Sequence, residues 1–184
     1  DDNPFRIELL HYKKLNALIR LEGSSSQKDG IFIKLFSVND KNKEIEIKKI
    51  NLNKKYEIIK LGKISLDYID TENKKNQIKL NAVNDRYVLT GSSFNTDKLI
   101  DELLSNNKDS KIFSINTNIE VNINKIYLDN KNELSNFEGN ILLNNKEIVK
   151  AKLKGNFSKN KELRFTINTD NSNKITTLYI DKAE

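Results

Sequence analysis

Apolar and polar residues alternate with a period of two along much of the chain. The alternation is clearest from Phe113 to Ile123, where every second residue is apolar or threonine and the residues between are Ser, Asn or Glu. Successive side chains of a β-strand point to opposite faces of its sheet, so this pattern predicts a strand with one apolar face and one face in water. The same alternation predicts strands over residues 149–157 and 163–167.

The first half of the chain is also typical of short strands, although the alternation is less regular there. Simple alternation puts Ile33 and Phe36 on opposite faces, which predicts a strand that is covered on both sides. Clusters of Asn, Asp, Lys and Gly, such as residues 70–76, and the Gly-Ser-rich stretch 23–30 separate the strands. They favour turns because Asn, Asp and Gly tolerate positive φ. The sequence therefore predicts an all-β, mainly antiparallel meander. The expected strands of this half are 5–9, 15–21, 31–35, 45–52, 56–61, 64–68, 78–82 and 87–90.

One segment has the spacing of a helix. Leucine and isoleucine recur three and four residues apart between Leu99 and Leu104, and Asn95 or Thr96 can cap the first turn. We expect a short α-helix within residues 94–107. It divides a single β-rich segment, 1–184, into first strands over 1–93 and later strands over 111–184.

The apolar face of such a sheet is too wide for this helix to cover. A helix from Thr96 to Ser105 would be about 15 Å long and about 10 Å across, whereas ten strands at ~4.8 Å spacing give a sheet almost 50 Å wide. The sheet must therefore fold on itself as a sandwich or barrel, or curl into an open trough whose lining meets something apolar. Alternation alone leaves both architectures open.

The charge pattern indicates an ordinary solvated surface. The net charge is +6, from 32 Lys and Arg against 26 Asp and Glu, and only four of the basic residues are Arg. Nucleic-acid readers use Arg for bidentate contacts and aromatic residues within a basic patch, whereas Lys is scattered here among Glu, Asp and Asn. We expect no nucleic-acid partner.

Signals for catalysis are weak. His11 is the sole histidine and Cys is absent, so neither a nucleophile with its base nor a His or Cys metal set can be assembled. The Gly-Ser stretches Gly23–Ser26 and Gly91–Ser93 lack phosphate-loop spacing. We expect no enzyme, catalytic residue, metal or cofactor. No run approaches the ~18 to 20 apolar residues of a membrane-spanning helix.

Four motifs follow one another in the second half of the chain. The stretch YVLTGSSFNTD at 87–97 runs into the expected helix, and LSNFEG at 134–139, IVKAKLKG at 148–155 and KITTLYID at 174–181 come after it. This order, with a strand that ends in Gly ahead of a short helix, resembles the YhdP-like branch of the AsmA-like superfamily. The resemblance covers about residues 87–184 and is diffuse before them. These motifs are structural and carry no chemistry.

The resemblance implies a sheet curled into a taco-like trough with an apolar groove. It also implies a bridge-like protein of Gram-negative bacteria that is anchored in the inner membrane, crosses the periplasm and carries phospholipid toward the outer membrane. The chain has no Met and no anchor helix, so we expect it to be a segment of a longer chain that supplies the anchor and further repeats.

We expect phospholipid acyl chains to lie on the apolar residues of the later strands, with head groups in water. The alternative is a closed β-sandwich that serves as a binding or scaffold module of the cell envelope. The candidate lipid-binding residues are Phe113, Ile115, Ile119, Val121, Ile123, Val149, Ala151, Leu153, Phe157, Leu163, Phe165 and Ile167.

Overall fold

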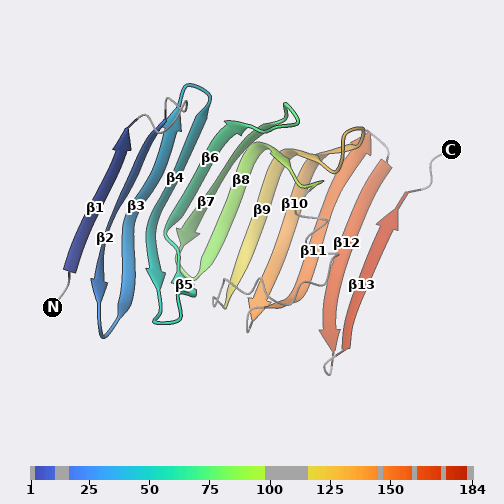
Figure 1. Ribbon diagram of the computed structural model, residues 1–184. Coiled ribbons are helices and arrows are strands. Elements are labelled where there is room, and N and C mark those ends of the chain that lie inside the picture. The colour runs from blue at the N-terminus through green and yellow to red at the C-terminus, as the bar shows by residue number, and fades with distance from the viewer. Residues whose placement is uncertain are drawn as a thin grey trace.

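The computed structural model describes residues 3–10, 17–97, 116–144, 147–158, 161–170 and 173–181. These residues form one open, curved, mixed sheet of thirteen strands, in which the strands follow one another across the sheet nearly in sequence order (Figure 1). The strands are β1 (Asn3–Leu10), β2 (Leu18–Ser26), β3 (Gly30–Asp40), β4 (Lys43–Leu52), β5 (Ile58–Lys60), β6 (Lys63–Ile69), β7 (Lys75–Val83), β8 (Arg86–Asn95), β9 (Thr117–Tyr127), β10 (Glu133–Asn144), β11 (Glu147–Ser158), β12 (Lys161–Asp170) and β13 (Asn173–Ile180).

The all-β, mainly antiparallel prediction is confirmed. Each strand on the main path pairs antiparallel with its neighbour except for β8 and β9, which are parallel, and short β5 pairs with β4 beside β6. Substantial contacts between strands are those of hydrogen-bonded neighbours. The described strands therefore form a single layer and not the closed sandwich of the alternative prediction.

The predicted helix is not part of what the structure shows. No helical element occurs in the described ranges, and residues 98–107, most of the predicted helix, lie outside them. Phe94 and Asn95, at the start of the expected segment, are the last two residues of strand β8. Thr96 follows the strand directly.

β-Bulges interrupt the alternation in the N-terminal half. The register of β2 against β3 shifts so that Glu22 lies opposite Leu35 and Gly23 lies opposite Ile33. The extra residue reverses the alternation, as a bulge does. Ile33 and Phe36 consequently pack on the same apolar side, opposite Ile50 and Ile47 of β4. The prediction that they occupy opposite faces was wrong.

Asn residues provide tight backbone conformations at turns between strands. Asn73, between β6 and β7, has φ 61°, and Asn84, between β7 and β8, has φ 56°. Asn adopts this region more easily than other side chains because it can hydrogen-bond locally. The turn expected over residues 23–30 is shorter than predicted, since β2 continues to Ser26.

Candidate functional site: the apolar face of the sheet

Apolar residues of one face form a continuous row across the whole sheet. Each member lies directly opposite the next on the neighbouring strand, so the row is a ladder of cross-strand pairs. It continues in the same way through β10 to β13. Its members are Ile7, Leu21, Phe36, Ile47, Ile64, Leu80, Leu89, Val121, Gly139, Leu153, Phe165 and Leu178.

A second apolar row runs beside the first. It begins with Leu9 opposite Ile19 and leads through Ile78 to Ile123 and Phe137. The two rows are two residues apart on each strand, so they share one face of the sheet. Together they make an apolar face that extends from β1 to β13.

The opposite face is polar over the same strands. One of its rows passes from Glu8 and Arg20 on the N-terminal strands to Glu138, Lys154 and Arg164 on the C-terminal ones. Lys154 Nζ lies 2.9 Å from a carboxylate oxygen of Glu138. Such exposed ion pairs contribute little to stability, about 0–1 kcal/mol each, but they keep this face in water. We refer to it as the charged face.

Burial on the apolar face is strongest at its centre. Leu134 has no exposed surface, and Val121, Ile123 and Ile126 are 2–3% exposed. They belong to one cluster, against which half-buried side chains such as Leu89 pack. A second cluster, around Ile50, Leu61 and Tyr87, continues the apolar surface toward β3 and β4.

The candidate residues on described strands lie on this face. Ile119, Ala151 and Ile167 are linked through Ile141 in one cross-strand row, and the others flank it. Val149 is half-buried at a register shift between β10 and β11. Ile119, Leu153, Phe157 and Phe165 are half-buried, whereas Val121, Ile123, Ala151, Leu163 and Ile167 are almost closed to water. Phe113 and Ile115 lie outside the described residues.

Sequence reasoning missed strand β10 as a contributor to the face. Leu134, Phe137 and Ile141 all belong to the central cluster or pack against it. Phe137 and Ile141 obey a two-residue period with Gly139 between them, which could have identified the strand. Leu134 could not be placed in this way, because Asn136, with φ 50°, interrupts the alternation.

A hollow lies on the charged face, over β8 to β12. Its volume is about 760 Å³. Most of the residues that line it alternate along β9, β11 and β12 with the candidate residues, so their side chains point away from the apolar rows. Val121, Gly139 and Leu153 of the apolar row also border it. The curvature that would turn the apolar face into a groove stays a prediction. Residues that line the hollow include Arg86, Glu120, Asn122, Lys152, Arg164 and Thr166.

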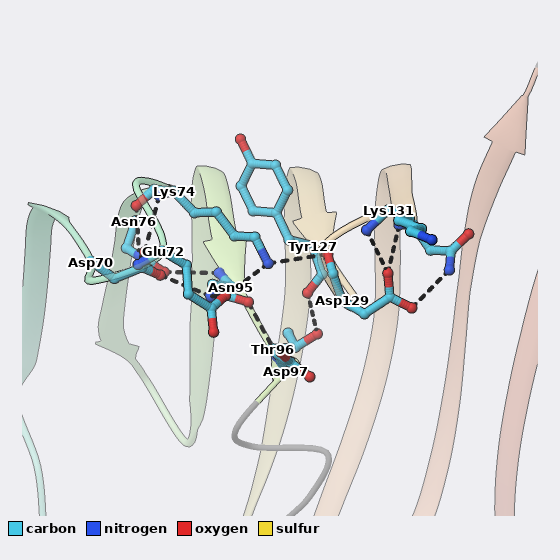
Figure 2. Close-up of polar contacts among 11 residues, drawn as sticks. Asp70, Glu72, Lys74, Asn76, Asn95, Thr96, Asp97, Tyr127, Asp129 and Lys131 are labelled. Atoms are coloured by element: carbon cyan, nitrogen blue, oxygen red, sulfur yellow. Dashed lines mark hydrogen bonds and ion pairs between the residues drawn. The ribbon is translucent and has the colours of Figure 1, made fainter.

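A polar network holds together one end of the sheet, where β8 and β9 both end (Figure 2). The Asp70 carboxylate accepts hydrogen bonds from the side-chain amides of Asn95 (2.8 Å) and Asn76 (3.1 Å). It also accepts the backbone N–H groups of Glu72 and Lys74, each at 2.9 Å. Asn76 is 1% exposed, so these bonds satisfy a polar group that has lost its water.

The network extends from β8 to β9 across the parallel pair. The Lys74 ammonium is paired with Glu72 (2.9 Å) and donates to the backbone carbonyl of Asp129 (3.0 Å). The hydroxyl and backbone N–H of Thr96 both donate to the carbonyl of Tyr127, at 2.8 and 2.9 Å. These bonds fix the end of β8 to the end of β9 and have the character of structural contacts.

Acid should weaken the Asp70 network. Burial would raise the pKa of this carboxyl, but the hydrogen bonds from Asn95, Asn76 and two backbone N–H groups outweigh burial and lower the pKa from 3.8 to about 2. The stabilisation is therefore complete above pH ~4 and is lost as the pH falls toward 2. Urea unfolding should show Asp70→Asn to be less stable than the natural chain at neutral pH, with the gap closing near pH 2. A constant gap over this range would contradict the assignment.

Other kinds of site find no support among the residues that the structure describes. No three His, Asp or Glu side chains within them are placed to hold a metal ion. Within the same ranges, no helix has the length and apolar character to cross a bilayer. His11 lies outside them.

Comparison of the chain with protein-family models, curated proteins and solved structures finds no match. The resemblance to the AsmA-like superfamily thus stays a hypothesis drawn from the sequence motifs. The account of function that follows depends on the two faces of the sheet.

Proposed function

We propose that this chain is a phospholipid transport segment of the cell envelope. Acyl chains lie on the apolar face while head groups stay in water. The observation that carries the proposal is the unbroken apolar row from Ile7 to Leu178, on a sheet with no second layer of described strands. An apolar sheet face of this extent that no other described strand covers is an unusual protein surface.

The degree of burial along the row suits a mobile hydrocarbon ligand. On either side of Val121, the side chains from Leu21 to Leu89 and those at Leu153 and Phe165 are half-buried, so they keep surface that an acyl chain can cover. Transfer of each CH₂ from water is worth roughly 0.8 kcal/mol, which gives two acyl chains ample driving force. The row carries no polar side chain, so a bound chain can slide from strand to strand.

The location follows from the family resemblance. In a protein of that type, the segment would belong to an inner-membrane-anchored chain that crosses the periplasm, and further repeats would lengthen the apolar surface. The runner-up function is a binding or scaffold module of the envelope that acts through a sheet edge. The outer edge of β13, which no other described strand pairs with, favours it as the second candidate.

Lipid analysis of the purified chain tests the proposal. The chain, produced in a Gram-negative host and purified without detergent, should carry phospholipid that native mass spectrometry detects. Leu153→Asp and Ile119→Asp should reduce the bound lipid at least ~10-fold, because a carboxylate interrupts the apolar rows. The matched control is Lys152→Asp, because Lys152 is next to Leu153 in the sequence but lies on the charged face. This variant should retain lipid.

Circular dichroism establishes that each variant keeps its sheet. A lipid-free natural chain that also fails to take up phospholipid from vesicles would refute the proposal. Equal loss of lipid from folded Leu153→Asp and Lys152→Asp would show that the apolar face is not the binding surface.

A further inference from the structure

Strand β13 is an edge whose outer side is unpaired among the described strands (Figure 1). All eight of its residues are exposed. Four of them are large apolar residues, at 50–59% exposure, and they occupy both faces of the strand. Leu178 and Ile180 continue the apolar face, whereas Ile175 and Tyr179 lie on the charged face, opposite Asn168 and Arg164.

The other edge strand, β1, has features that discourage strand addition. Pro4 has no N–H to offer to a neighbouring strand, and Arg6 forms ion pairs with Glu8 (3.2 Å) and Glu22 (3.6 Å) on the charged face. Proline and charge are the usual means by which proteins protect sheet edges. β13 has no proline and Lys174 is its single charged residue, so the two edges differ in their readiness to pair.

The register of β12 against β13 identifies the free backbone groups. The N–H of Asp181 donates to the carbonyl of Glu162 at 3.1 Å, so backbone groups of alternate residues back from Asp181 point toward β12. Those of Lys174, Thr176, Leu178 and Ile180 point outward. An added strand would pair with these four residues.

We propose that two copies of this chain pair edge to edge through β13, antiparallel, about a two-fold axis at Thr177. A two-fold axis perpendicular to the sheet keeps both apolar faces on the same side and yields a closed, isologous dimer. Pairing of β13 with β1 of another copy would instead be parallel and open-ended, and it would use the protected edge. This inference does not rest on lipid binding, and it applies to a chain in which no further repeat pairs with β13.

Side chains in this register complement one another. On the charged face, Ile175 lies opposite Tyr179 of the second copy, a pairing of β-branched and aromatic residues that stabilises antiparallel sheets. On the apolar face, Leu178 lies opposite Thr176 of the second copy. Lys174 lies opposite Ile180 of the second copy, so no like charges meet. The same pairs recur on the other side of the axis.

Charged substitutions at Thr177 test both the dimer contact through β13 and its register. At about 100 μM, where a contact of micromolar affinity is populated, light scattering after size exclusion should give the natural chain twice its 21.3 kDa mass. Thr177→Lys and Thr177→Glu each place a charge opposite its own copy and should weaken the dimer at least ~10-fold. An equimolar mixture of the two variants should recover it.

Two further variants keep the test independent of folding. Thr166→Lys introduces the same charge one strand inward, directly opposite Thr177, and should leave the dimer intact. Thr176→Pro removes an outward N–H without breaking the β12 ladder and should give a folded monomer, as judged by circular dichroism. A monomeric natural chain, assemblies that grow with concentration, or Thr177 variants that still dimerise would each overturn the proposal.

Discussion

Leu134→Ala is expected to lower the free energy of unfolding by about 3 kcal/mol. Leu134 has no exposed surface and lies at the centre of the apolar cluster of β9 and β10. Truncation of a fully buried leucine removes its transfer free energy and leaves a cavity, which together cost about 2–5 kcal/mol. Urea unfolding followed by far-UV circular dichroism measures the change.

The same strand supplies the control. Leu142 of β10 lies on the charged face, opposite Lys150, and is 40% exposed. Leu142→Ala should therefore cost less than about 1 kcal/mol. Equal losses at Leu134 and Leu142 would mean that β10 does not bury one face in preference to the other, contrary to the register described above.

Gly139→Ala should destabilise the sheet by about 2 kcal/mol or more, although it adds only a methyl group. A Cβ at this position would lie 2.0 Å from the carbonyl oxygen of Lys152 and 2.9 Å from Leu153 Cα, and both are backbone atoms that cannot move independently. Gly139 also has φ 149°, a conformation that side chains rarely adopt. The strand would have to shift away from β11.

Asn140→Ala is the matched control for Gly139→Ala, because Asn140 is the next residue of β10 and is exposed on the charged face. Its effect on unfolding should stay within about 0.5 kcal/mol. Comparable stability of Gly139→Ala and the natural chain would show that β10 and β11 approach each other less closely than the structure indicates.

Much of the strand content could be predicted because a strand with one wet face has an unmistakable period of two. Ile119, Val121 and Ile123 alternate with Glu120 and Asn122, and the prediction that they share a face is confirmed by their register with β10. The turn composition of residues 70–76 was equally informative, since Asn73 adopts the positive φ for which Asn is suited.

The features that the sequence did not predict arise from β-bulges and from parallel strand pairing. Neither can be recognised from the alternation of apolar and polar residues. A single inserted residue near Lys34 puts Ile33 and Phe36 on the same face. The parallel pairing of β8 with β9 depends on contacts between distant segments and has no local signal. Strand β13 was indicated only by its resemblance to a family motif, because KITTLYI has no regular alternation.

Photocrosslinking from neighbouring residues of β12 tests lipid binding by the apolar face most directly. Phe165 belongs to the apolar row and Thr166 to the charged face, one residue away on the same strand. With benzoylphenylalanine at either position, irradiation with phospholipid vesicles should give a lipid adduct at 165 and little or none at 166. Equal labelling of the two positions, or no adduct at 165 in a folded chain, would contradict the account.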